Sequence, residues 1–397
     1  MVKKILCSAA LLAPLMLLFA GLASAQGQFV YTNDDIGFAP NTVSGFSVAS
    51  NGTLTLISGS PFLTGGTGNG GGFFATNRTR AGIVGNCLFA SNTVSNDVSA
   101  FTIDTSTGAL TLVPGSPFPM VGFGDGLGIA VAPTPNGMFL MAANGGSVTV
   151  YSVASGCALT AIAGNPFPTL STSNGIKVSA NGSFLAVAET FPSSQIEMFT
   201  IASSGSLTSV GGFPGGGGSL GGALTGVDIN CASSLAFGGE ANGTETIVDG
   251  YSIASGGTLT TVKGSPFEVV SGVNSNVVLL GAKPGSKPVA HSKLLFVSNQ
   301  FSNGFAGSIT VFSVSSKGSL SLVKGSPFPM NSGSFLPSGM DTSPDGSLLY
   351  VANPSNEVSV FSVSSKGVPT EVAGSPFSTG QPGGLLSLAA FPSRACK

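Results

Sequence analysis

The chain has 397 residues, a formal net charge of −2 and 8% charged residues, against roughly 25% in ordinary globular proteins. Its three arginines and its lysines form no basic cluster, which argues against nucleic-acid binding. The 59 glycines are typical of short strands joined by tight turns.

Residues 1–25 have the pattern of a secretory signal peptide. Lys3 and Lys4 supply a basic start, residues 5–20 an apolar run, and Ala23-Ser24-Ala25 a small-residue cleavage site. An uncleaved membrane anchor is the alternative. No second apolar span follows, so we expect residues 26–397 to form one soluble domain, secreted or periplasmic, without a membrane span. Loss of the two lysines takes the net charge from −2 to −4.

The tetrapeptide Gly-Ser-Pro-Phe recurs along the chain. It occupies 59–62, 115–118, 264–267, 325–328 and 374–377, with a softened copy, Gly-Asn-Pro-Phe, at 164–167 and a scrambled one, Gly-Gly-Phe-Pro, at 211–214. These seven copies are 47 to 61 residues apart. A fixed period of this length indicates a repeat architecture.

Each repeat contains four short runs of β-branched and aromatic residues, bounded by Gly, Asn, Asp and Pro. In the last repeat they are 338–344, 348–353, 358–363 and a fourth run that ends at 374–377. Such runs predict strands. Four antiparallel strands in each of seven units predict an all-β, seven-bladed β-propeller. Proline is confined to sheet edges, so the tetrapeptide should end the outer strand, with its phenylalanine between neighbouring sheets.

The two ends of the predicted domain complement each other. Residues 29–33 form a second-strand motif without an inner strand before it, and 383–390 form one strand left over after the seventh repeat. An open ring would leave an unpaired edge. We therefore expect the C-terminal strand to complete the first blade.

The repeats resemble a known family. Tyr31-Thr32-Asn33, Val351-Ala352-Asn353 and the Ser-Pro-Asp-Gly turn at 343–346 resemble the Tyr-Val-Thr-Asn repeat propellers. The whole unit, with its Gly-x-Leu-x-x-Val-x-Gly-Ser-Pro-Phe fourth strand, resembles the lactonase family, which includes propeller-type 6-phosphogluconolactonases and muconate-lactonising enzymes.

The resemblance implies lactone hydrolysis by histidine, arginine and glutamate residues near the axis. In this chain Arg78 and Arg80 are expected after the inner strand of blade two. His291, the single histidine, is expected in the corresponding turn of blade six. Both places are on the face opposite the candidate glutamates, so the chain departs from the family pattern.

The predicted inner strands carry an unusual group of charges. Strand alternation directs Lys177, Asp228 and Asp341 toward the channel, where they could hold a polar ligand; the alternative is a hydrated channel whose ion pairs carry no activity. The expected ring is Phe74, Ala130, Lys177, Asp228, Val278, Asp341 and Leu386.

A second ring is expected at the ends of the second strands, on the loop face. Asn144 and Asn299 are candidate ligand-binding residues there, although asparagine at such places is often simply part of a turn. Glu189 and Glu240 replace asparagine in adjacent blades, and one could have a raised pKa and act as general base on a lactone. They could instead bind a cation or face solvent. The ring comprises Asn33, Asn92, Asn144, Glu189, Glu240, Asn299 and Asn353.

Four cysteines follow the signal peptide: Cys87, Cys157, Cys231 and Cys396. Two disulfides are possible, in three connectivities. Their places favour a Cys87–Cys396 bond that would join neighbouring blades at the ring closure; Cys157 and Cys231 look too distant for a second bond. With one histidine and no Cys-x-x-Cys pair, a zinc site is not expected.

Two function classes follow. The first is an exported propeller that binds a small molecule or a protein at its channel or loop face. The alternative is a lactone hydrolase with Glu189 or Glu240 as base and Lys177 stabilising developing negative charge. No nucleophile elbow, phosphate loop or dinucleotide fingerprint occurs in its required context, so no cofactor is expected. A structural cation stays open at Asp34-Asp35 or Asn96-Asp97. We expect a monomer.

Overall fold

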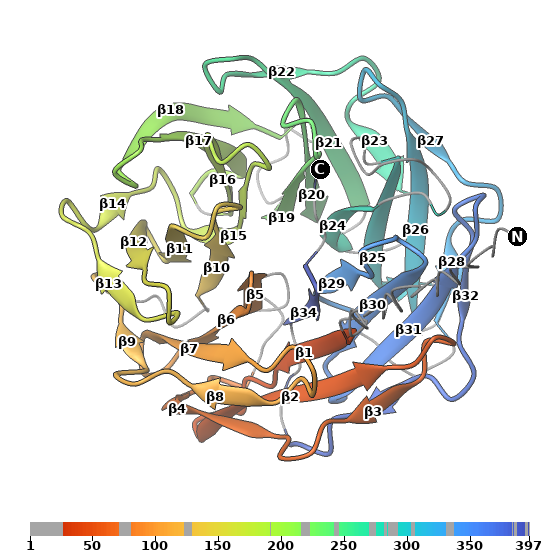
Figure 1. The fold of residues 1–397 in the computed structure, drawn as a ribbon. Coiled ribbons are helices and arrows are strands. Elements are labelled where there is room, and N and C mark those ends of the chain that lie inside the picture. Colours follow the sequence, from red (N-terminus) through yellow and green to blue (C-terminus); the bar gives the residue numbers. More distant parts are fainter. Residues whose placement is uncertain are drawn as a thin grey trace, which may run out of the picture.

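The seven repeats form seven small antiparallel sheets arranged around a central opening (Figure 1), which confirms the seven-bladed β-propeller. The described residues contain no helix, and so none that could span a membrane. The predicted signal peptide at 1–25 lies outside them. The computed structural model describes residues 27–70, 81–122, 129–190, 192–215, 223–241, 246–269, 275–281, 284, 293–302, 306–330, 337–382, 384, 387–393 and 396.

The strands of each blade follow from the channel outward. Blade one contains β34 (Ser387–Phe391), β1 (Phe29–Asn33), β2 (Pro40–Val48), β3 (Leu54–Leu56) and β4 (Phe62–Thr67). Blade two contains β5 (Ala81–Val84), β6 (Cys87–Asn92), β7 (Asp97–Ile103), β8 (Leu110–Leu112) and β9 (Phe118–Pro119). Blade three contains β10 (Ala130–Pro133), β11 (Phe139–Asn144), β12 (Ser147–Val153), β13 (Leu159–Ala161) and β14 (Phe167–Pro168). Blade four contains β15 (Ser173–Val178), β16 (Phe184–Glu189), β17 (Gln195–Ile201) and β18 (Leu207–Pro214).

The remaining blades repeat this order. Blade five contains β19 (Ala223–Ile229), β20 (Leu235–Ala241), β21 (Thr246–Ile253), β22 (Leu259–Thr261) and β23 (Phe267–Val269). Blade six contains β24 (Ser275–Gly281), β25 (Leu294–Ser302), β26 (Ala306–Val314), β27 (Leu320–Leu322) and β28 (Phe328–Pro329). Blade seven contains β29 (Met340–Thr342), β30 (Leu348–Asn353), β31 (Glu357–Val363), β32 (Pro369–Glu371) and β33 (Phe377–Ser378).

The Gly-Ser-Pro-Phe motif interrupts the outer edge of a blade. In blade one, β3 and β4 both pair with β2 on either side of the motif. The Ser60 hydroxyl accepts a hydrogen bond from the Gly45 N–H at 3.0 Å, so a third-strand donor is satisfied where the edge is interrupted. In the softened copy the Asn165 side-chain oxygen accepts from the Val150 N–H at 2.8 Å.

Blade four shows the effect of losing the motif. Its copy is Gly-Gly-Phe-Pro, and its outer edge is one continuous strand, β18, with a register shift opposite Met198 and Phe199. The motif therefore determines where the outer strand divides.

The predicted ring closure is confirmed. The C-terminal strand β34 pairs with β1, with Phe29 opposite Phe391 and Asn33 opposite Ser387. The hydrophobic core lies between neighbouring blades; the cluster that joins blades one and two includes Tyr31 and Phe101, with Phe62 of the motif against it. The motif phenylalanines thus pack between sheets, as predicted.

Candidate functional site

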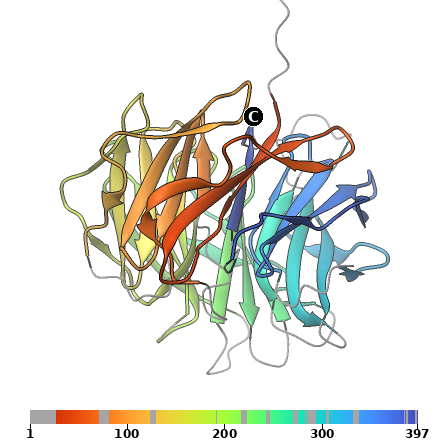
Figure 2. The same ribbon diagram turned by 90° about the horizontal axis from the view of Figure 1, so that it is seen from below.

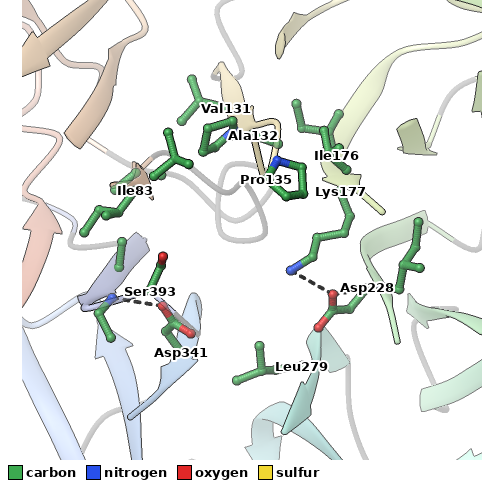
Figure 3. Close-up of a pocket in the computed structure, with 18 of the residues that line it drawn as sticks. Ile83, Val131, Ala132, Pro135, Ile176, Lys177, Asp228, Leu279, Asp341 and Ser393 are labelled. Atoms are coloured by element: carbon green, nitrogen blue, oxygen red, sulfur yellow. Dashed lines mark hydrogen bonds and ion pairs between the residues drawn. The ribbon is translucent and has the colours of Figure 1, made fainter. Parts of the chain in front are cut away.

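A cavity of about 520 Å³ occupies the channel. Inner strands of all seven blades line it (Figure 3). Most of the residues that line the cavity have apolar side chains. Among them are Pro135 and, at the positions that strand alternation directs toward the axis, Ala132, Leu279 and Ala390.

The polar part of the wall centres on an ion pair. Lys177 Nζ lies 2.9 Å from Asp228 Oδ1, and the side chain of Lys177 is 35% exposed while that of Asp228 is 3% exposed. The Asp228 carboxylate also accepts the N–H groups of Ile229 and Leu280, each at 2.8 Å. Because Leu280 belongs to β24, Asp228 joins the inner strands of blades five and six.

Asp341 has a related role in blade seven. It accepts the Thr342 N–H at 2.8 Å and, from β34 of blade one, the Ala390 N–H at 2.9 Å. Figure 3 shows it near Ser393, on a different part of the wall from the Lys177–Asp228 pair. Two of the three predicted channel charges therefore hold neighbouring inner strands together, and their roles toward a ligand stay predictions.

The predicted ring of channel-facing residues is confirmed at Lys177, Asp228 and Asp341 and differs from the structure in the other four blades. Lys177, Asp228 and Asp341 each pair with the residue three positions before the end of the second-strand motif. The same register gives Gly82, Ala132, Leu279 and Ala390 in the other blades, in place of Phe74, Ala130, Val278 and Leu386.

Two irregularities explain the error. The inner strand of blade two begins only at Ala81, and a register shift separates Ser275 from Val278 in blade six. Outside the described residues lie Phe74, Arg78, Arg80, His291 and Leu386.

The second ring is buried, with exposed fractions between 0% and 5%. Its asparagines bond mainly to neighbouring strands rather than form the local turn considered from sequence. Asn353 donates to Ser359 Oγ at 2.8 Å, and Asn299 donates to Ser308 Oγ and Thr310 Oγ1 at 3.0 and 2.8 Å. Asn144 donates to Asn96 Oδ1 of blade two at 2.6 Å.

Neither Asn144 nor Asn299 lines the channel cavity. Their predicted role as ligand-binding residues is therefore not supported by their place in the structure, where they join strands and blades.

In blades four and five, where glutamate replaces asparagine at the end of the second strand, the third strand also carries an acidic residue. On the third strand, the residue two positions beyond the direct partner of the ring residue is Glu197 or Asp249 where other blades have Ser99, Thr310 or Ser359. Blade four thus buries the pair Glu189 and Glu197, and blade five the pair Glu240 and Asp249. All four carboxyl groups are at most 2% exposed.

In the blade-four pair, burial and the neighbouring acid raise the pKa of Glu189. Glu189 forms a side-chain hydrogen bond with Glu197, and burial, together with that neighbour, raises the pKa of Glu189 to about 8. The carboxyl of Glu189 also accepts from Gln195 Nε2 at 2.6 Å and from the Ser171 N–H at 3.2 Å. Glu189 is therefore protonated at neutral pH, because like charges in a buried site cannot both ionise cheaply.

The same pair holds the connection from blade three to blade four. Glu197 Oε2 accepts the Leu170 N–H at 2.9 Å, beside the bond from Ser171 to Glu189. In blade three the equivalent Thr149 hydroxyl bonds to Val121 on the preceding connection. The acid pair therefore occupies a position that fixes blade connections.

The structure does not bring the proposed lactonase residues together. Lys177 lines the cavity, whereas Glu189 and Glu240 do not; both glutamates are buried at the ends of β16 and β20. A mechanism that uses either of them as base beside Lys177 has no support in this arrangement.

The acidic pairs considered for a cation have other partners. Asp34 accepts hydroxyl hydrogen bonds from Thr32, Thr42 and Ser44 at 2.6 to 2.8 Å, and burial raises its pKa to about 6. Asp97 accepts from Asn92 Nδ2 at 2.6 Å. Among the described residues, no group of three or more His, Cys, Asp or Glu side chains could hold a metal ion.

The predicted disulfide pairing is wrong. Cys87 is bonded to Cys157, and Cys396 to Cys231. The first bond joins blade two to the turn between the third and fourth strands of blade three. The second joins Cys396, which follows β34, to the turn between β19 and β20 of blade five. Cys396 is therefore bonded to blade five and not, as predicted, to the adjacent blade two.

Comparisons with known proteins agree with the fold. Residues 288–385 match the family model described as lactonase, 7-bladed beta-propeller, which confirms the resemblance over that segment. No curated protein matches the chain.

Solved structures match over nearly the whole chain. A candidate 6-phosphogluconolactonase from Bacteroides fragilis is 17% identical, with a TM-score of 0.67, over 93% of this chain and 99% of its own. A second, from Bacteroides uniformis, is 16% identical, with a TM-score of 0.69, over 92% and 99%. The periplasmic gluconolactonase of Pseudomonas aeruginosa is 14% identical, with a TM-score of 0.63, over 89% and 98%. At these identities the likeness shows the fold alone.

Proposed function

We propose that this protein is an exported propeller that binds a small molecule in its central channel. The observation that supports this is the cavity of about 520 Å³, with apolar walls and the Lys177–Asp228 ion pair. Pockets for small ligands are of this size, mostly apolar, and carry a few placed polar groups. A suitable ligand has an apolar face for the walls and an oxygen acceptor for the Lys177 ammonium group.

The test is calorimetric titration of the mature protein with sugar acids, their lactones and aromatic carboxylates. For any ligand that binds, Lys177→Met should weaken binding by about tenfold to a hundredfold, since a hydrogen bond to a charged group contributes roughly 1.5–3 kcal/mol. The exposed Lys317 gives the matched control: Lys317→Met should leave binding unchanged. Unchanged binding in Lys177→Met would place the ligand elsewhere.

Lactone hydrolysis is the second candidate, favoured by the family match over residues 288–385. Its test is turnover of a panel of sugar-acid lactones against spontaneous hydrolysis, beside Glu189→Gln/Glu240→Gln. Turnover that survives this double variant would exclude both glutamates as the base. Absence of turnover on every lactone would leave ligand binding without catalysis.

Export is part of the proposal. The signal-like pattern at 1–25 supports it, and so do the two disulfides among the described residues, because disulfides persist mainly in oxidising compartments. N-terminal sequencing of the protein recovered outside the cytoplasm should begin after Ala25; a chain that begins at Met1 would contradict cleavage.

A further inference from the structure

Four lysines that are distant in sequence form two pairs on the outer rim of the propeller. Lys317 belongs to the turn between β26 and β27 of blade six, and Lys263 follows β22 of blade five. The Ser319 hydroxyl of that turn donates to the Lys263 carbonyl at 3.3 Å, and a Cβ on Gly318 would lie 2.9 Å from Val262. The contact between blades five and six therefore carries a lysine on each side.

The contact between blades six and seven repeats this arrangement. Lys366 belongs to the turn between β31 and β32, and Lys324 follows β27. A Cβ on Gly367 would lie 3.5 Å from Val323, so the neighbours of the two lysines touch. Figure 1 shows β22, β27 and β32 in succession along the rim, and Figure 2 shows blades six and seven, in cyan and blue, side by side. We call the four lysines, all of which are exposed, the lysine surface.

The other blades carry no charge at the two equivalent positions. One position lies in the turn between the third and fourth strands, and the other directly precedes the motif. Elsewhere in the ring they are occupied by Asn51, Thr107, Gly156, Ser204 and Gly256, and by Ser58, Pro114, Ala163, Val210 and Ala373. Since those blades form with uncharged residues at these positions, the fold does not require the lysines.

The acidic residues of these blades leave the lysine surface positive. Within the part of the chain that the structure describes, no ion pair involves any of its four lysines. Glu371 accepts a hydrogen bond from the Ser375 hydroxyl at 2.8 Å, and Asp345 accepts from serines of its own turn. Glu268 and Glu357 lie toward the loop face, beyond the motif and at the start of a third strand. Unpaired lysines gathered in this way attract an anionic partner.

The surroundings of the lysine surface favour an anionic polysaccharide over other polyanions. Exposed hydroxyl groups lie in the same turns and outer strands, and such groups donate to and accept from sugar hydroxyls and carboxylates. They belong to Ser315, Ser316, Ser321, Ser364, Ser365 and Thr370. Among the described residues of blades five to seven, Leu322 is the one exposed large hydrophobic side chain. A bilayer surface is bound through several such side chains, and single-stranded nucleic acid through exposed aromatic rings.

We propose that the lysine surface binds a polysaccharide whose sugar units carry carboxylates. The two pairs follow each other along the rim, so one extended polymer can place carboxylates on both, with charge-assisted hydrogen bonds from the ammonium groups. Because the four lysines do not line the channel cavity, this surface is separate from the channel. An open rim holds a single sugar acid weakly and a polymer through several lysines at once. The inference therefore goes beyond the proposed function.

The test measures binding of the mature protein to immobilised polygalacturonate and alginate by biolayer interferometry in about 50 mM NaCl. The test variant replaces all four lysines by glutamine: Lys263→Gln/Lys317→Gln/Lys324→Gln/Lys366→Gln. It should bind roughly tenfold to a hundredfold more weakly than the wild type, as expected from the loss of four exposed ion pairs. Wild-type binding should weaken with added salt. Polygalacturonate with methyl-esterified carboxyl groups keeps the sugar backbone without the charge and should not bind.

The matched protein control is Asn51→Asp/Ser58→Asp/Ala163→Asp/Ser204→Asp. It lowers the net charge by the same amount as the test variant, at the same two positions in other blades. All substituted residues are exposed, so both variants should keep the wild-type circular dichroism spectrum. The control should bind the polymers like the wild type.

An equal loss of binding in the two variants would mean that net charge alone governs binding, and it would overturn the lysine surface as a site. Failure of the wild type to bind either polymer would overturn the proposal as well. Binding to phosphatidylglycerol vesicles or DNA instead would assign the surface to another polyanion. Since no channel ligand takes part, these outcomes are independent of whether the channel binds a small molecule.

Discussion

The buried pair of Glu189 and Glu197 makes the stability of the propeller depend on pH. The pKa of Glu189 is raised from 4.5 to about 8 in the folded protein, by burial and by Glu197. The folded state therefore binds a proton that the unfolded chain releases between these two values. The stabilisation is complete below pH 4.5 and is lost as the pH rises through about 8.

The size of the effect follows from the shift. A pKa of about 8 in place of 4.5 makes the folded state bind the proton more tightly by, at most, about 5 kcal/mol. Ionisation above pH 8 would place two negative charges beside the Leu170 and Ser171 amides, and the blade connection can relax to admit water. We therefore expect the free energy of unfolding to fall by roughly 2–4 kcal/mol between pH 5 and pH 9.

The informative variant is Glu189→Gln. Glutamine has the shape of the protonated glutamic acid and can still donate to Glu197, but it does not ionise. Urea unfolding followed by far-UV circular dichroism at pH 5, 7 and 9 suits this chain, which has no tryptophan. The variant should lose most of the pH-dependent fall, keep the smaller part that Asp34 contributes as the pH passes its pKa of about 6, and exceed the wild type in stability at pH 9.

The control is Glu268→Gln, at an exposed position of β23, which should reproduce the wild-type profile. If Glu189→Gln and the wild type lost stability in parallel between pH 5 and pH 9, Glu189 would not hold the proton in the folded state, and the argument would fail.

Two further predictions concern stability. Asp341→Asn replaces one acceptor by a donor that faces a backbone N–H, so the free energy of unfolding in urea should fall by about 1–3 kcal/mol; a fall below this range would mean that Asp341 does not join blades seven and one. Gly108→Ala should lower the free energy of unfolding by about 2 kcal/mol or more, because Gly108 has φ +76° and an added Cβ would lie 2.6 Å from the Phe29 ring. Gly146→Ala, where a Cβ meets nothing within 4 Å, is the control; an equal loss in both variants would mean that neither the positive φ nor the contact with Phe29 sets the cost at Gly108.

The repeat unit could be predicted from sequence because each strand carries its own local signal. The tetrapeptide marks the outer edge, and the Asn-terminated run marks the second strand. The pairing of β1 with β34 could be predicted as well, since the first blade lacked one strand and the chain end supplied one. These features depend on alternation and on counting, which sequence displays directly.

The inner strands were less predictable because they carry insertions and irregular register. In blade two the sequence placed Phe74 at the channel-facing position, where the structure has Gly82 of β5. The disulfides were mispredicted because their pairing depends on the path of the few residues after Phe391, for which sequence offers no periodicity. Only the structure shows that Cys396 is bonded to Cys231 of blade five.

The acid pairs lay within reach of sequence reasoning. Glu189 and Glu240 were recognised as departures from asparagine, but Glu197 and Asp249 were not recognised as their partners. Extending each hairpin pairing by two residues along the third strand, to the next side chain on the same face, would have placed Glu197 near Glu189 and Asp249 near Glu240. That comparison would have predicted a buried pair of carboxyl groups rather than a solvent-facing general base.

The first blade takes strands from both ends of the chain, because β34 is the inner neighbour of β1. A ribosome makes β1 before the other strands and β34 after all of them. Six blades can assemble as the chain emerges, but the first must wait for the last residues to be synthesised. A chain that stops before Ser387 therefore lacks the strand that closes the ring. Only the complete chain can form the first blade.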